Sequence, residues 1–420
     1  MKKQDELRIG GIGLQKQILI NGIKFIYEYR SGNLTSFCIG FEAGALMEEG
    51  YKKGIAHVVE HMLFKGTSTR SEKEINKLCD EVFAFHNAMT NYPYCIYYGT
   101  TLSEDFRTGF ELYSDIILNP SFKEEGFKEE IDIICEELLE WKDDITQYCE
   151  DELLFNAFKN RRIKELIIGS KESVKSITLD EIKAFYERFY APENCVVTVI
   201  SSLGFHEVLK IVKENLGEWR KEYVKPQLKL YEDNISGIFI KERKGISGAK
   251  LQYIYSIHEL TDREVNILKL FNVSFGEGIS SILYDEVRTK HGLVYDIGST
   301  IKNEKGIKLY TIYFGTSKFN IKTAIKLIDS IINDIKTSKN YFTKERIENT
   351  AKIIKLKREF NMERAVELCK SLTSYEIMYG SYEKFLYEEN NLNNFTEEEI
   401  LKVINKVLTK PSIQIISPEI

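Results

Sequence analysis

Alternating apolar and polar residues predict that the chain opens with a β-hairpin. The pair Asn21-Gly22 interrupts such an alternation between residues 17 and 29, which is typical of a tight turn between two antiparallel strands. Residues 34–43 predict a further strand, and residues 88–100 predict another. A helix is expected between them, from about Gly54 to Lys65.

Capping boxes predict where other helices begin. Three Ser or Thr residues each stand three positions before a Glu. The Ser or Thr side chain can then accept from the backbone N–H of the Glu, and the Glu side chain from the backbone N–H of the Ser or Thr. They predict helices that start at Ser71, Thr178 and Thr261, and the first is expected to extend through Phe85. Further helical patterns cover residues 104–118, 124–141 and 146–158.

The order of these elements predicts two similar domains. Residues 220–234 are polar and lack a clear period, and after them the succession of strands, helices and strands starts again. We therefore expect an N-terminal domain at 1–225 and a C-terminal domain at 235–420. The predicted class is α+β, each domain being a mainly antiparallel sheet with helices packed on one face.

Composition excludes several classes of protein. The formal net charge is −6 and basic residues form no dense block, so nucleic acid is not an expected partner. The apolar runs are too short for a membrane span, and the first residues do not resemble an export signal. The 7 cysteines include no CxxC pair, which favours reduced thiols and a cytoplasmic location.

One short string carries most of the chemical information. His57, Glu60 and His61 form an H-x-x-E-H motif on the predicted helix from Gly54. Imidazoles four residues apart share a helix face and can bind one Zn²⁺ ion, while a nearby carboxylate that is not a ligand can accept a proton from water. Only 6 His occur in the chain, and a chance match is about a 1% event.

A catalytic zinc needs a third protein ligand, which spacing alone does not identify. One more Asp, Glu or His must therefore converge from elsewhere in the sequence, and within the Glu-rich segment 130–137 the residues alone do not distinguish Glu136 from Glu137. By itself, this segment is more typical of a solvated helix face.

The motif resembles that of the M16 (pitrilysin/insulinase) metallopeptidases, also called inverzincins. In that family a Glu on a later helix completes the zinc site, and segment 130–137 is similar to the family's segment. The resemblance implies that Glu137 is the third ligand. It also implies that Glu130, two turns earlier on the same helix face, supports the ligands from behind.

Two more segments resemble the same family. Asn87, Ala88 and Thr90 match an Asn-Ala-x-Thr element that leads into the strand along which these enzymes bind extended peptides. The glycines that usually precede this element are replaced by Ala84–His86. In the second half, Arg288 and Tyr295 match a signature that implies hydrogen bonds to the substrate backbone and the developing oxyanion.

The resemblance implies a zinc-dependent endopeptidase that hydrolyses peptides or unstructured segments inside an enclosed dimeric chamber. The chain carries both signatures, so a homodimer is expected, or a heterodimer with a related chain. The alternative is a peptide-binding or assembly subunit without catalysis, although such relatives typically lose residues of the zinc site.

Overall fold

The computed structural model describes residues 5–9 and 12–419, and contacts group the chain into two compact units. Unit 1 contains the residues up to Leu139, together with Leu166–Leu228 and Phe360–Leu386. Unit 2 contains Glu140–Glu165, Lys229–Glu359 and the residues from Tyr387 onward. Each unit therefore includes a segment from the other half of the sequence. The division into domains at 1–225 and 235–420 stays a prediction.

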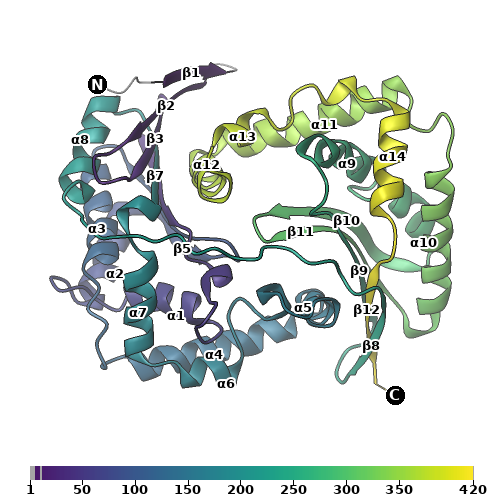
Figure 1. The fold of residues 1–420 in the computed structure, drawn as a ribbon, viewed down its shortest axis with the longest axis horizontal. Helices are drawn as coiled ribbons and strands as arrows, with labels where there is room; N and C mark the ends of the chain where they lie inside the picture. The colour runs from purple at the N-terminus through teal and green to yellow at the C-terminus, as the bar shows by residue number, and fades with distance from the viewer. Residues whose placement is uncertain (1–4, 10–11, 420) are drawn as a thin grey trace. The chain divides into compact units, whose positions relative to one another are not determined.

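Unit 1 is built on a seven-stranded sheet with the order β1-β2-β3-β7-β4-β6-β5 (Figure 1). Neighbouring strands are antiparallel, except for the parallel pair of β3 and β7. The strand at one edge, β5, is the one that follows the first capped helix. The strands are β1 (Asp5–Ile9), β2 (Ile12–Ile18), β3 (Lys24–Tyr29), β4 (Leu34–Phe41), β5 (Phe83–Thr90), β6 (Cys95–Leu102) and β7 (Cys195–Ser201).

Helices cover both faces of this sheet. In Figure 1, α3 and α8 lie on one side of the strands and α12 on the other. Every residue of β7 is buried, which explains why its sequence is apolar almost throughout rather than alternating. The helices are α1 (Ile55–Leu63), α2 (Glu72–Val82), α3 (Phe106–Leu118), α4 (Phe127–Asp143), α6 (Lys171–Ser176), α7 (Leu179–Phe189), α8 (Phe205–Leu216) and α12 (Ala365–Tyr379).

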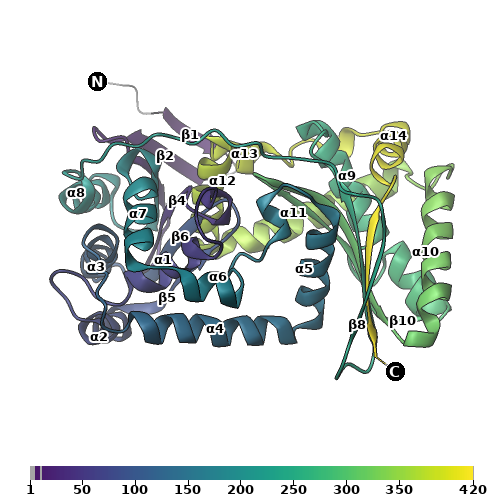
Figure 2. The same ribbon diagram turned by 60° about the horizontal axis from the view of Figure 1, so that its bottom comes forward.

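Unit 2 is built on a five-stranded sheet with the order β10-β11-β9-β12-β8, in which β12 and β8 are parallel. Figure 2 shows α5 on one side of these strands and α10 on the other. The strands are β8 (Gly237–Arg243), β9 (Ala249–Ser256), β10 (Val294–Glu304), β11 (Ile307–Thr316) and β12 (Ser412–Pro418). The helices are α5 (Ile145–Ala157), α9 (Asp262–Phe275), α10 (Ile321–Lys336) and α14 (Glu397–Val407). Three helices run across the unit boundaries: α4, α11 (Lys344–Glu363) and α13 (Glu383–Tyr387).

The fold confirms the α+β class with two sheets that are mainly antiparallel. The capping boxes at Ser71, Thr178 and Thr261 are all formed, each with hydrogen bonds in both directions. A fourth capping box, at Thr396, starts α14. Local sequence therefore specifies these helix starts.

Two predictions about the segment after Ser71 were wrong. The helix ends at Val82 instead of reaching Phe85, and the single strand expected at 88–100 is a hairpin of β5 and β6. Packing explains the earlier end: a Cβ atom added to Gly99 would lie 2.6 Å from the Phe83 ring, so this glycine makes room for that ring in the strand pair.

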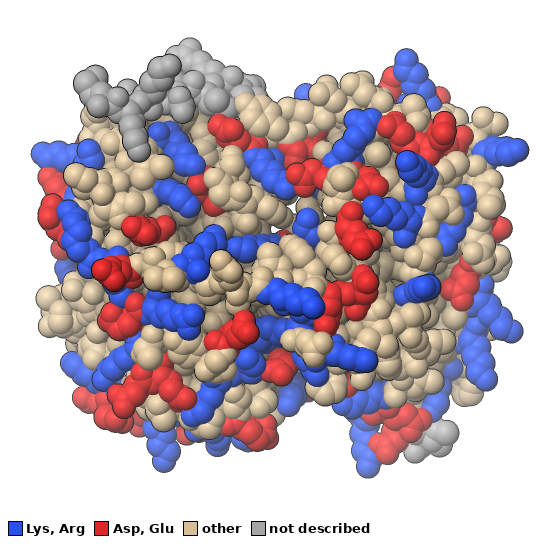
Figure 3. Space-filling view, in the orientation of Figure 1, with Lys and Arg blue, Asp and Glu red and all other residues tan. Residues whose placement is uncertain are grey.

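The surface mixes charges of both signs. On the face shown in Figure 3, basic and acidic side chains are interspersed among the residues that are drawn in colour. Within the described ranges, no helix combines the length and the apolar character that crossing a bilayer requires. The seven cysteines are buried free thiols.

Candidate metal centre

Helix α1 begins with an unusual N-terminus. The N-cap Gly54 has φ of 94°, and a Cβ atom there would lie 2.4 Å from the carbonyl oxygen of Ile168. The buried carboxylate of Glu48 accepts hydrogen bonds from the N–H groups of Gly54 and Ala56, each at 3.1 Å. A negative group at this end also suits the helix dipole, so α1 starts at a fixed point.

The two faces of α1 differ in burial. Its apolar residues, from Ile55 to Leu63, are buried against unit 1. His57, Glu60 and His61 are partly exposed and lie three and four positions apart, on the remaining face. The helix therefore presents two imidazoles and one carboxylate together, as the motif predicted.

Helix α4 brings a carboxylate close to the two imidazoles. Potential ligand atoms of His57, His61 and Glu137 all lie within 4.8 Å of one another. The two Nε2 atoms are 3.2 Å apart, and Oε2 of Glu137 is 3.9 Å from Nε2 of His57 and 3.6 Å from Nε2 of His61. Glu136 is exposed on α4 and is not part of this group.

Glu130 orients one of the imidazoles. Its Oε1 lies 2.7 Å from Nδ1 of His61, so the Nδ1–H of that ring donates to the carboxylate and Nε2 is left facing the cluster. Glu130 is only 5% exposed. It lies two turns before Glu137 on α4.

Burial and charge shift the pKa values of these groups in different directions. Burial lowers the pKa of His57 to about 3, and the neighbouring charge of His61 acts in the same direction. Burial would also lower the pKa of His61, but the hydrogen bond to Glu130 and the charge of Glu137 outweigh it and raise that pKa. For Glu60, burial raises the pKa above its usual value.

The donor set fits a zinc ion. Two nitrogens bound to one tetrahedral zinc are separated by about 3.3 Å, close to the 3.2 Å between the two Nε2 atoms. Two His and one Glu are also a ligand set of catalytic zinc sites, which leave the fourth position to water or substrate. The Nδ1 hydrogen bond to Glu130 is the outer contact that zinc-binding His residues usually make.

The Asn87 segment lies on the edge strand β5. Asn87 is exposed, and Ala88 is partly exposed beside it. The Thr90 hydroxyl donates a hydrogen bond to Oε2 of Glu60, a contact that the sequence did not reveal. Of the three residues, Thr90 is thus connected to the carboxylate of the motif.

Arg288 and Tyr295 belong to unit 2. Arg288 lies in a π-helix, Tyr284–Lys290, and its guanidinium stacks 4.7 Å from the ring centre of Tyr284. Tyr295 is 56% exposed at an irregularity of β10, and a Cβ atom on Gly315 would lie 2.2 Å from its ring. The described contacts join the two residues to neighbours within unit 2.

Sequence reasoning missed one residue next to the cluster. The ammonium of Lys65 lies 2.5 Å from Oε2 of Glu130, whereas His61 contacts Oε1. Burial would raise the pKa of Glu130, but the hydrogen bonds to His61 and Lys65 hold it below its usual value. The available signal was that Lys65 follows His61 by four positions, one helical turn.

Two models of one protein family match this chain. The model for "Insulinase (Peptidase family M16)" matches residues 25–171, and that for "Peptidase M16 inactive domain" matches residues 176–354. The first match contains His57, His61 and Glu137, the three residues of the candidate metal site. Together the two models cover more than three quarters of the chain.

Individual relatives agree over nearly the full length. An uncharacterized zinc protease of Rickettsia bellii is 24% identical over 407 residues, which are 94% of this chain and 92% of that protein. The uncharacterized zinc protease YmxG of Bacillus subtilis is 24% identical over 401 residues, or 95% and 97% of the two chains.

Solved structures share the fold. A protease from Helicobacter pylori has a TM-score of 0.88 at 18% identity and covers 97% of this chain and 100% of its own. An M16-like peptidase from Alicyclobacillus acidocaldarius has a TM-score of 0.83 at 16% identity, over 99% and 100% of the two chains. With both halves of the sequence matched by models of one family, the chain belongs to the M16 (insulinase) family of peptidases.

Proposed function

We propose that this protein is a zinc-dependent endopeptidase that hydrolyses peptides and unstructured polypeptide segments. The observation that carries the proposal is the cluster of His57, His61 and Glu137, with the carboxylate of Glu60 on the same helix face. Relatives described as zinc proteases support the same activity.

His57, His61 and Glu137 would hold the zinc ion, each through one atom of the cluster. When bound, zinc acts as a Lewis acid that polarises the carbonyl of the peptide bond and lowers the pKa of water. Glu130 keeps the Nδ1 proton of His61 in a hydrogen bond, so that Nε2 is the nitrogen available for coordination.

Glu60 would move the proton. Its carboxylate accepts a proton from the attacking water molecule as the water oxygen bonds to the peptide carbonyl carbon. The same proton then passes from Glu60 to the amide nitrogen, which leaves as an amine when the C–N bond breaks. The Thr90 hydroxyl donates to Oε2 of Glu60 and so restrains the rotation of this carboxylate.

Substrate binding would use both halves of the sequence. The outer edge of β5, which carries Asn87 and Ala88, can pair with an extended peptide backbone. Arg288 and Tyr295 would donate hydrogen bonds to the substrate and to the developing oxyanion. In a homodimer with an enclosed chamber, these two residues would serve the metal centre of the partner subunit, and a related chain could take the place of one subunit.

The activity belongs in a reducing compartment, and we propose the cytoplasm. The seven cysteines are buried as free thiols, so the fold uses them as small apolar side chains. Oxidising conditions would favour disulfides that this arrangement does not contain.

The test compares the wild type with Glu60→Gln, a change that keeps the metal ligands and removes the proton acceptor. We expect about one zinc per chain in both proteins, and a peptide cleavage rate at least about 10²-fold lower in the variant. Zinc content is measured by elemental analysis, and cleavage with a library of unstructured peptides.

A matched pair on α4 controls for the metal site. Glu137→Gln should lose zinc, whereas Glu136→Gln should retain both zinc and activity because its side chain is exposed outside the cluster. Zinc binding without any cleavage would refute the endopeptidase proposal for this chain alone, and absence of zinc as well would favour a peptide-binding subunit.

A further inference from the structure

Lys65 connects the end of α1, which carries two residues of the candidate metal site, to helices α2 and α4. It lies just beyond the end of α1, with its ammonium 2.5 Å from Oε2 of Glu130 on α4 and 2.9 Å from Oε1 of Glu72 on α2. Glu130 in turn uses its other oxygen, Oε1, for the 2.7 Å contact with His61. A continuous path of charged contacts therefore runs from Glu72 to a metal ligand.

Burial makes the contact between Lys65 and Glu130 important. Glu130 is 5% exposed, and its Oε2 contacts the ammonium of Lys65 at 2.5 Å. A carboxylate oxygen buried in this way is costly unless a cation compensates it. Removing the ammonium of Lys65 would leave Oε2 uncompensated, and the carboxylate could then rotate away from His61.

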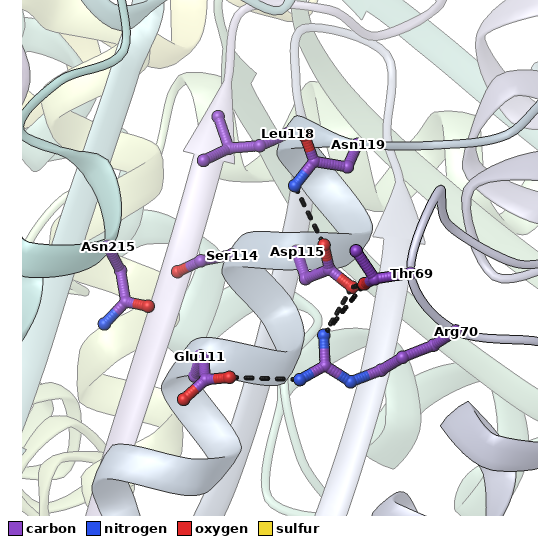
Figure 4. A pocket seen from close by; sticks show the side chains of 8 residues that line it. All are labelled: Thr69, Arg70, Glu111, Ser114, Asp115, Leu118, Asn119 and Asn215. Carbon is purple, nitrogen blue, oxygen red and sulfur yellow. Dashed lines mark hydrogen bonds and ion pairs between the residues drawn. The ribbon is translucent and has the colours of Figure 1, made fainter.

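The loop that follows Lys65 is anchored to α3. The Thr67 hydroxyl donates to Oδ2 of Asp115 at 2.8 Å. The Thr69 hydroxyl and the Arg70 guanidinium donate to the same oxygen at 2.9 and 2.6 Å (Figure 4). These contacts fix the backbone from which the Lys65 side chain extends.

A pocket of about 460 Å³ lies beside this anchored loop. Figure 4 shows the guanidinium of Arg70 between the carboxylates of Glu111 and Asp115, so the charged groups of the pocket already bind one another. We therefore interpret the polar residues of this pocket as contacts that hold the loop after Lys65 against α3, and not as a ligand site. Its lining residues are Thr69, Arg70, Glu111, Ser114, Asp115, Leu118, Asn119 and Asn215.

We propose that Lys65 is a positioning residue of the metal centre. It holds the carboxylate of Glu130, and through it the His61 ring, with Nε2 directed at the metal. The inference rests on the proposed zinc function of the same site. Outer contacts of this kind typically change metal affinity by about 10–100-fold when they are removed.

The test is a double-mutant cycle in which zinc affinity is measured by competition with a chelator, without any activity assay. We expect Lys65→Met and Glu130→Gln each to weaken zinc binding by about 10–100-fold. If Lys65 acts through Glu130, the double variant should bind zinc no more weakly than Glu130→Gln alone, because the contact is already lost.

A second Lys-to-Met change controls for the loss of a positive charge. Lys77→Met removes an exposed lysine of α2 that pairs with Glu81, and it should leave zinc affinity unchanged. The melting temperature of each metal-free variant shows whether the fold is intact. Lys65→Gln takes the place of Lys65→Met in the cycle if the methionine variant does not fold.

Two results would overturn the inference: zinc affinity in the Lys65 variant within about threefold of the wild type, against the expected loss, or strictly additive losses in the cycle. Failure of the proposed function gives a different result. A wild type that does not bind zinc would refute the metal centre, whereas a wild type that binds zinc but cleaves no peptide would refute only the peptidase activity.

Discussion

Glu60 and Glu130 lie near the same pair of imidazoles but are held by different partners. Glu60 accepts a hydrogen bond from a neutral hydroxyl, that of Thr90, and burial raises its pKa. Glu130 contacts a cation, Lys65, and its pKa is held below the usual value despite burial. Opposite shifts in neighbouring carboxylates are typical of sites where one group moves a proton and the other stays charged.

Thr90 provides a prediction about the first of these carboxylates. Thr90→Val keeps the shape of the side chain but leaves Oε2 of Glu60 without its donor. A hydrogen bond to a charged group contributes about 1.5–3 kcal/mol, so we expect kcat to fall by about 10–100-fold. KM and zinc content should change little, because the change alters neither the backbone of β5 that would pair with a peptide nor the three proposed metal ligands.

Thr90→Ser is the matched control, since it restores the hydroxyl on a slightly smaller side chain. Its kcat should stay within a fewfold of the wild type. Equal losses in the two variants would show that Thr90 matters for packing or substrate contact, as the sequence resemblance alone suggested, and not for holding Glu60.

At this scale, the sequence predicts residues that share one helix and misses contacts between elements. His57, Glu60 and His61 could be grouped from spacing, because a helix turn places them on one face. The contact between Thr90 and Glu60 joins β5 to α1, and that between Lys65 and Glu130 joins the end of α1 to α4. Such contacts depend on how elements pack, which spacing does not record.

At the scale of elements, helix starts were predictable and one helix end was not. A capping box such as that of Ser71 is a local set of hydrogen bonds, so the sequence contains all of its parts. The end of α2 depends instead on Phe83, whose ring occupies the space that Gly99 leaves in a strand distant in sequence from the cap. Tertiary packing therefore decides where the strand begins.

Helix α12 provides a prediction about an element far along the chain. Leu372 is fully buried in the core cluster that α12 forms with strands of the unit 1 sheet, whose residues lie in the first half of the sequence. Leu372→Ala should destabilise unit 1 by about 2–5 kcal/mol. Glu367→Gln changes a partly exposed side chain of the same helix that pairs with Lys370, and it should cost no more than about 1 kcal/mol.

The two tryptophans allow this effect to be assigned to one unit. Trp219 contacts Phe41 within unit 1, whereas Trp141 donates to Asp151 within unit 2. In a Trp141→Phe background, urea unfolding followed by fluorescence reports unit 1 through Trp219. A midpoint that Leu372→Ala does not shift would contradict a stabilising role of α12 in this unit.

At the scale of the whole molecule, the repeat of strands and helices was visible in the sequence. The sequence did not show that each unit includes a segment from the other half of the chain. Helix α5 groups with unit 2, where Cys149 donates to backbone carbonyls of Lys250 and Gln414. Helix α12 groups with unit 1. Both helices are only weakly amphipathic, so their sequences do not indicate which sheet each one covers.

The proposed dimer can be tested by mixing two inactive chains. Glu60→Gln lacks the proton acceptor, and Tyr295→Phe lacks the hydroxyl that would bind the oxyanion while keeping the ring that packs over Gly315. If each metal centre uses Tyr295 of the partner subunit, a mixed dimer contains one intact site. Equal amounts of the two chains, reassembled at random, should then recover about a quarter of the wild-type activity per chain, because half of the dimers are mixed and half of their sites are intact. If Tyr295 instead serves the metal centre of its own chain, every site in the mixture lacks one group and activity stays at the average of the two parents.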